Sequence, residues 1–252
     1  MTLTPDIHES YAALMVASVA LLLLVPTTAH FTHPADRGRY YTMQAITALG
    51  AVAGAKLGVL FGDALWPLRP LDDWSALLAS GRSIAGALLV GFLAVEAAKP
   101  LLRYDQPPND RFAVALPFSI ALGRIGCLVA GCCRGAPHDG AFAIAYDDGI
   151  LRHPAQLYEA LFQLLAGWAL LRLWRRKILF GRLFALYLAA YGAFRFTTEF
   201  IRDTAKPFAG LSAYQWMAVA MVVAGVAAIY LRSRSQPESW RRWNADILGA
   251  AR

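Results

Sequence analysis

Apolar stretches about 20 residues long recur along this chain, and they constrain its fold more than any other feature. A helix rises about 1.5 Å per residue, so about 20 apolar residues match the hydrocarbon thickness of a bilayer. Seven such stretches can be marked, at residues 9–29, 42–62, 84–102, 111–130, 154–174, 182–200 and 213–231. The pattern predicts an all-α, polytopic membrane bundle of about seven transmembrane helices.

The composition agrees with a membrane protein, because 58% of the residues are hydrophobic and only 16% are charged. Soluble domains average about 25% charged residues. We predict a single transmembrane domain over residues 1–231, with an outer-surface segment at 63–82 and a basic cytoplasmic tail at 232–252. The N-terminal sequence MTLTPDIHES is acidic rather than basic, so we expect the first stretch to be a retained helix and not a cleaved signal peptide.

Most lysine and arginine residues lie at the same end of the predicted helices, and therefore on one side of the membrane. They are dense at 37–39, 99–111, 172–182 and 232–252, which all fall on one side. By the positive-inside rule, the N-terminus lies outside and the C-terminus lies in the cytoplasm. The net charge of +7 then reflects topology and attraction to anionic lipid headgroups. We expect the bilayer to be a partner, and we expect no nucleic-acid binding.

Charged residues inside the apolar stretches indicate a functional site. Arg124, Arg195 and Glu199 each lie within a predicted span. A charge at mid-bilayer costs about 2.5–3.5 kcal/mol even on lenient scales, so such residues usually face the bundle interior and take part in function. Counting along the helices places them, together with Glu159 and Arg202, in the outer leaflet.

The spacing of these charges predicts an anion site. Arg195, Glu199 and Arg202 are spaced i, i+4 and i+7, so they share one face of a helix on which Glu199 can pair with either arginine. Lys56 could join them from another helix or extend to the outer interface. Arginines outnumber glutamates in the group, which a purely structural ion-pair network would not require. Guanidinium groups match phosphate bidentately, and the phosphate at this depth belongs to a phospholipid.

Four motifs, in order along the chain, resemble those of the prolipoprotein diacylglyceryl transferase family. They are GRIGCLVAG, HPAQLYEALF, YGAFRFTTEFIR and GLSAYQW. The resemblance implies a seven-span enzyme of the bacterial inner membrane without a cofactor. Such an enzyme transfers the diacylglyceryl group of phosphatidylglycerol to the lipobox cysteine of a prolipoprotein and releases glycerol 1-phosphate. Expected partners are phosphatidylglycerol or a related phospholipid, and prolipoprotein signal peptides.

The charge pattern and the resemblance together define the expected site residues. The predicted phospholipid-binding residues are Arg124, Arg195, Arg202, Lys56, Tyr158 and Gln215. The predicted catalytic residues are Arg124, Arg195, Glu199, Glu159 and His153. The reaction would need a base for a thiol of pKa near about 8.5 and cations for the leaving phosphate. Arginine side chains supply the second requirement.

The chain departs from the family pattern at the position of the base. Ala85 stands where the family typically has a histidine that is favoured as general base, and Cys127 stands where it usually has asparagine. Glu159, Glu199 or His153 could act as the base instead. A divergent member that uses another acceptor, and a non-enzymatic phospholipid-binding or transport protein, are therefore alternative functions.

Three cysteines close the fourth span in a C-x4-CC pattern. Cys127, Cys132 and Cys133 are candidate reactive thiols, and one of them could accept or relay a transferred group. The spacing matches no standard zinc pattern, so we expect no metal site. Small side chains that ease helix packing beside Gly126 and Gly131 are the simpler interpretation. A thiol or metal protein is the third alternative.

Overall fold

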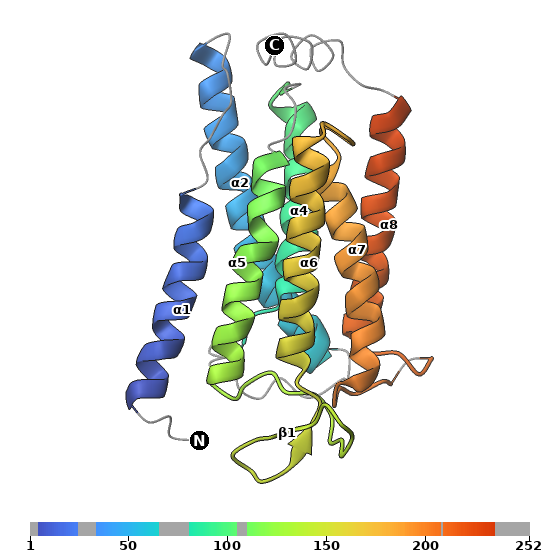
Figure 1. Cartoon of the computed structure of the whole chain (residues 1–252). Coiled ribbons are helices and arrows are strands. Elements are labelled where there is room, and N and C mark those ends of the chain that lie inside the picture. Colours follow the sequence, from blue (N-terminus) through green and yellow to red (C-terminus); the bar gives the residue numbers. More distant parts are fainter. Residues whose placement is uncertain (1–4, 25–33, 66–80, 105–109, 208, 235–252) are drawn as a thin grey trace. The chain divides into compact units, whose positions relative to one another are not determined.

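The computed structural model describes residues 5–24, 34–65, 81–104, 110–207 and 209–234 (Figure 1). Within these ranges the chain forms seven α-helices: α1 (Pro5–Leu23), α2 (Pro34–Val59), α4 (Ile84–Leu101), α5 (Asp110–Val129), α6 (Ala155–Arg175), α7 (Leu183–Thr198) and α8 (Ala213–Arg234). A π-type turn, η1 (Leu60–Leu65), extends α2, and a 3-10 turn, η2 (Glu199–Ile201), extends α7. Two short antiparallel strands, β1 (Ile144–Ala145) and β2 (Leu151–Arg152), form a hairpin between α5 and α6.

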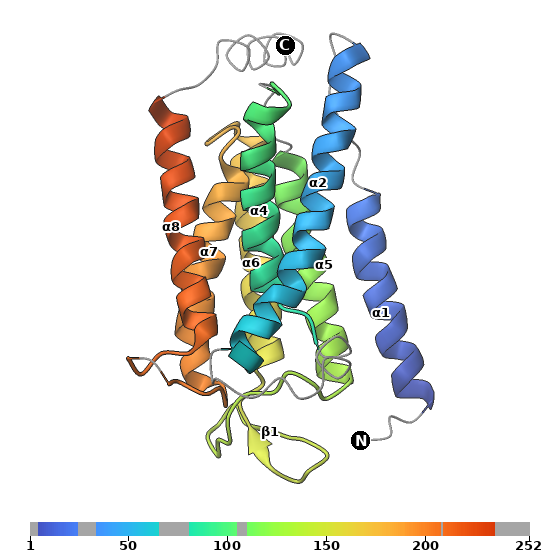
Figure 2. The same ribbon diagram turned by 180° about the vertical axis from the view of Figure 1, so that it is seen from behind.

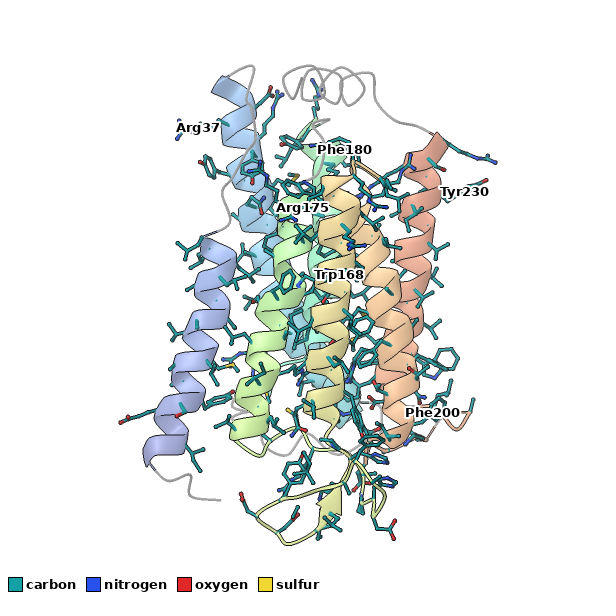
Figure 3. The ribbon with its side chains drawn as sticks, in the orientation of Figure 1. Arg37, Trp168, Arg175, Phe180, Phe200 and Tyr230 are labelled. Atoms are coloured by element: carbon teal, nitrogen blue, oxygen red, sulfur yellow. The ribbon has the colours of Figure 1, made fainter. Side chains whose placement is uncertain are left out.

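The predicted all-α membrane bundle is confirmed. Helices α2, α4, α5 and α8 are long and apolar enough to cross a membrane. Large apolar side chains point outward along the helices, among them Trp168 on α6 and Tyr230 on α8, and Phe200 just after α7 (Figure 3). Exposed apolar surface of this extent is typical of contact with lipid. The protein is therefore a multi-pass membrane protein, while its orientation and the limits of a single domain stay predictions.

Two helices begin earlier than the apolar stretches predicted. The first begins at Pro5 rather than residue 9, and the second begins at Pro34 rather than residue 42. Proline suits the first turn of a helix, because its φ is already helical and its missing N–H is not needed there. In the first turns of α2, Asp36 and Arg39 form an ion pair at 3.4 Å. A count of apolar residues finds only the apolar part of a helix. The polar first turns of α1 and α2 were therefore missed.

The helices group into two compact units, and the first is built on α5. It comprises α1, α5, α6, the segment between α5 and α6, both ends of α7 and the residues up to Thr204. Helix α5 packs against α1 on one side and against α6 on the other (Figure 1). Ser119 Oγ of α5 donates a hydrogen bond to the Ser18 carbonyl oxygen of α1 at 2.7 Å. Asp110, at the start of α5, accepts a hydrogen bond from Gly181 N at 2.6 Å.

The second unit is built on a close crossing of α2 and α4. It also contains α8 and the middle of α7, residues 188–196 (Figure 2). Gly50, Gly54 and Gly58 follow one another at intervals of four, so they line one face of α2. A Cβ atom at Gly54 would collide with the Gly86 carbonyl oxygen and the Val90 side chain of α4. Small residues at this spacing let membrane helices approach to backbone contact.

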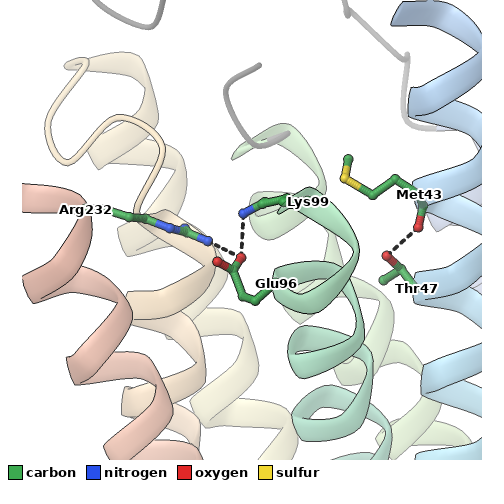
Figure 4. Close-up of polar contacts among 5 residues, drawn as sticks. All are labelled: Met43, Thr47, Glu96, Lys99 and Arg232. Atoms are coloured by element: carbon green, nitrogen blue, oxygen red, sulfur yellow. Dashed lines mark hydrogen bonds and ion pairs between the residues drawn. The ribbon is translucent and has the colours of Figure 1, made fainter. Parts of the chain in front are cut away.

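A charged cluster joins α4 to α8 within the second unit. Glu96 of α4 accepts hydrogen bonds from Lys99, one turn further along α4, and from Arg232 of α8 (Figure 4). Near this end of α4, Ala98 is buried with Tyr40 and other residues in an apolar core. The Glu96 carboxylate thus has two cationic partners, and its contact with Arg232 ties α4 to α8.

Enlarging the glycine at the α2–α4 crossing should destabilise the second unit. We expect Gly54→Leu to lower the unfolding temperature of the detergent-solubilised protein, because overpacking typically costs about 1–3 kcal/mol. Gly38→Leu, also on α2, is the matched control, since a Cβ there meets nothing within 4 Å. Equal unfolding temperatures for the two variants would contradict the close crossing.

Candidate functional site

A buried ion pair joins α5 to α6 in the first unit. Arg124 Nε lies 3.0 Å from Glu159 Oε2. The residues are only 9% and 2% exposed, respectively. Arg124 lies in the second half of α5 and Glu159 in the second turn of α6, and the antiparallel packing of these helices brings the two positions together. Removing one partner of a buried pair leaves an uncompensated charge and costs about 3–5 kcal/mol. Glu159 therefore fixes the position of the Arg124 guanidinium group.

Polar residues line one face of α6 on either side of this pair. Gln156, Glu159 and Gln163 are spaced i, i+3 and i+7, and all three are buried. Gln156 accepts a hydrogen bond from the Tyr146 hydroxyl at 2.9 Å, and Gln163 accepts one from the Tyr187 hydroxyl at 2.8 Å. The sequence prediction missed both glutamines, although their helical spacing relative to Glu159 was visible.

The segment after α7 is tied to the turn that follows α5. Ala136 N donates a hydrogen bond to the Ile201 carbonyl oxygen at 2.8 Å. Arg202 Nη2 donates one to the Cys133 carbonyl oxygen at 3.2 Å. Glu199 is fully buried and accepts a hydrogen bond from Thr204 Oγ1 at 2.8 Å. The first unit therefore gathers Arg202 and Glu199 at the end of the α5–α6 pair where the cysteines lie.

The predicted continuous helical face from Arg195 to Arg202 is wrong at its far end. Helix α7 ends at Thr198, the chain tightens into the 3-10 turn, and Arg202 has an extended backbone with φ −106° and ψ 146°. A 3-10 turn has three residues per turn, so the i, i+4, i+7 pattern of an α-helix no longer aligns the side chains. Arg195 itself is buried and belongs to the second unit.

Lys56 and Gln215 also belong to the second unit, where each has a structural contact. Lys56 Nζ donates a hydrogen bond to the Gly81 carbonyl oxygen at 3.5 Å. Gln215 Oε1 accepts a hydrogen bond from Ser212 N at 2.9 Å, while Gln215 N donates one to Ser212 Oγ at 3.2 Å. This reciprocal pair is a capping box at the start of α8. It gives the buried Gln215 a structural role, whereas the motif had been assigned to lipid binding.

The second unit also has an apolar cavity of about 310 Å³. Residues of α2, η1, α4 and α8 line it, among them Leu57, Phe61, Leu89 and Trp216. Its lining lacks charged side chains, so the cavity suits hydrocarbon rather than a polar group.

His153 lies in the hairpin region just before α6 and stacks on His138. The ring centroids are 3.8 Å apart and the planes differ by 10°. His153 Nδ1 is 3.4 Å from the Tyr158 hydroxyl. Burial, and secondarily the neighbouring His138 ring, lower the pKa of His153 from its usual value. At neutral pH His153 is therefore uncharged and able to accept a proton.

The three cysteines come together at the end of α5. Their sulfur atoms all lie within 4.8 Å of one another, and all three thiols are free. Cys127 and Cys132 are half-buried, whereas Cys133 is exposed. Hydrogen bonds with the Cys127 and Cys132 thiols hold the pKa of Cys133 below its ordinary value, and the charges of Arg124 and Arg202 act in the same direction.

The histidine stack should make stability depend on pH. Because folding lowers the pKa of His153, its contribution to stability is complete above the unfolded value of about 6.5 and is lost as pH falls below it. We expect the unfolding temperature of the detergent-solubilised protein to fall between pH 7.5 and pH 5, and to fall less in His153→Phe, which keeps a ring but cannot titrate. The same dependence in both proteins would contradict this assignment.

Comparison with known proteins identifies the family. The sequence model of prolipoprotein diacylglyceryl transferase matches residues 4–231. A phosphatidylglycerol–prolipoprotein diacylglyceryl transferase of Bordetella parapertussis is 34% identical over 203 residues, which cover 76% of each chain. The transferase of the same name from Nitrosomonas europaea is 32% identical over 210 residues, which cover 77% of this chain and 74% of the relative. This chain, as its motifs predicted, belongs to the prolipoprotein diacylglyceryl transferase family.

Proposed function

We propose that this protein transfers the diacylglyceryl group of phosphatidylglycerol to the cysteine thiol of a prolipoprotein and releases glycerol phosphate. The observation that carries the proposal is the similarity to transferases named for these two substrates over about three quarters of the chain. The site in the first unit has the groups that the reaction requires, namely buried arginine, carboxylate and an uncharged histidine.

Arg124 and Arg202 are proposed to bind the phosphate. A guanidinium group keeps its charge at any relevant pH and matches two phosphate oxygens at once. Glu159 orients Arg124, and the Cys133 carbonyl oxygen orients Arg202. Arg195, Lys56 and the other predicted lipid-binding residues, Tyr158 and Gln215, remain proposals that rest on charge pattern and resemblance.

The reaction requires a proton acceptor as well as a phosphate site. The thiolate sulfur attacks the glycerol carbon that carries the phosphate, a C–S bond forms, and the C–O bond breaks with its electron pair on the phosphate oxygen. The thiol proton needs a base, and Ala85 cannot supply one. We assign this role to His153, because it is uncharged at neutral pH, whereas Glu159 is paired with Arg124 and Glu199 is fully buried.

The proposed location is the bacterial inner membrane, with the phosphate site in the outer leaflet. Support comes from the clusters of basic residues that alternate with the helices. Some of these pack on aromatic rings, as where the Arg172 guanidinium lies 4.2 Å from the Trp168 ring centroid on α6. A prolipoprotein signal peptide would then reach the site from the membrane.

A different thiol acceptor is the second candidate, and the replacement of the family histidine by Ala85 favours it.

Transfer can be measured with purified protein, phosphatidylglycerol and a lipobox peptide. We expect a diacylglyceryl mass gain on the peptide and an equal amount of glycerol phosphate. Arg124→Lys keeps a charge beside Glu159 but loses the planar fork, and Arg202→Gln removes a charge. Each should lower the rate about 100-fold, because a donor to developing negative charge is worth about 10²–10³ in rate. Arg172→Gln is the control and should retain the rate.

The outcomes separate the candidate functions. Glycerol phosphate release without peptide modification would assign another acceptor. Phosphatidylglycerol binding without release of glycerol phosphate would instead indicate a lipid-binding protein. Full activity in Arg124→Lys and Arg202→Gln would contradict the phosphate site even if the transferase activity itself is present.

A further inference from the structure

The cysteine cluster is not used by the proposed transfer reaction. Cys127 comes from the last turn of α5, whereas Cys132 and Cys133 come from the turn that follows it. Three sulfur ligands at metal–sulfur distances of about 2.3 Å lie about 4.0 Å apart in a trigonal arrangement. The sulfur atoms already lie within 4.8 Å of one another. Small side-chain rotations would therefore bring all three to ligand distance of one ion.

The backbone of the turn is held in place without a ligand. Gly131 and Cys133 have φ values of 61° and 59°, in the left-handed region that a non-glycine residue rarely adopts. Cys132 N donates a hydrogen bond to the Cys127 carbonyl oxygen at 3.1 Å, and the Gln156 side chain donates one to the Cys132 carbonyl oxygen. Such a turn persists only when its surroundings determine it, so the sulfur atoms are preorganised.

Two arginines place positive charge near the turn. Arg202 donates its hydrogen bond to the Cys133 carbonyl oxygen, which places a guanidinium group beside the cluster. Arg124 lies on α5 one turn before Cys127. Metal binding requires deprotonated thiols and releases their protons, so nearby positive charge assists it. The exposed Cys133 gives an ion access from solvent.

We propose that Cys127, Cys132 and Cys133 together bind one thiophilic metal ion, and that the three-sulfur set favours Cu(I). Among the described residues, no histidine or carboxylate joins the three sulfur atoms as a fourth ligand. Structural zinc sites almost always have four protein ligands. Cu(I) is a soft ion that thiolates bind well, and it does not require a fourth ligand. The C-x4-CC spacing alone gave no metal prediction, because it does not reveal that the turn at Gly131 folds the second and third sulfur atoms back toward the first.

Metal binding can be measured without transferase activity. The protein is reduced in detergent and titrated anaerobically with Cu(I) in competition with the chelator bicinchoninate. We expect one Cu(I) per chain and a near-ultraviolet absorption band from sulfur-to-copper charge transfer. Cys127→Ser, Cys132→Ser and Cys133→Ser should each weaken Cu(I) binding at least about 100-fold. His138→Asn changes a potential ligand near the turn and is the control, so it should retain the affinity. Thermal unfolding checks that each variant is folded.

Several results would overturn the proposal. Cu(I) affinity that is unchanged in the three serine variants would show that the sulfur atoms are not the ligands. Tighter binding of Zn(II) than of Cu(I), or a loss of affinity in His138→Asn, would contradict the three-sulfur set. A disulfide between two of the three cysteines, formed without any metal binding, would contradict the metal site and indicate a redox pair instead. None of these results depends on whether the protein transfers lipid.

Discussion

The ion pair between Arg124 and Glu159 is the interaction on which the proposed site depends. Between two packed helices of a membrane protein, neither charge could be buried without the other. Their contact at 3.0 Å links α5 to α6, and Gln156 and Gln163 extend the same polar face of α6 toward Tyr146 and Tyr187. The cost of burying polar side chains explains why Arg124, Glu159, Gln156 and Gln163 each have at least one polar contact.

Most of the helical fold could be predicted from the sequence. Apolar length located each of the α-helices in the described ranges, because the bilayer fixes how long an apolar segment must be. Burial of Arg124, Glu159, Arg195 and Glu199 also followed from their position within apolar stretches. Helix starts were less accurate, since a proline such as Pro5 or Pro34 begins a polar turn that hydropathy does not detect.

Local backbone geometry accounts for what the sequence did not predict. The 3-10 turn at Glu199 breaks a face that α-helical spacing had implied. Gln215 caps α8 through Ser212, a pattern that was visible as S-x-x-Q but was assigned to lipid binding. The approach of the three sulfur atoms depends on left-handed residues at Gly131 and Cys133, and only the glycine hinted at this. The histidine stack pairs residues from two sides of the hairpin, which no local pattern reveals.

The position of the Arg124 guanidinium group depends on its ion pair with Glu159, and a double-mutant cycle measures the energy of this pair. The free energy of unfolding in detergent is compared for the wild type, Arg124→Gln, Glu159→Gln and the double variant. We expect each single variant to lose about 3–5 kcal/mol, because it leaves one buried charge unpaired, and the double variant to lose clearly less than the sum. Losses that simply add would contradict the ion pair as the interaction that positions the site.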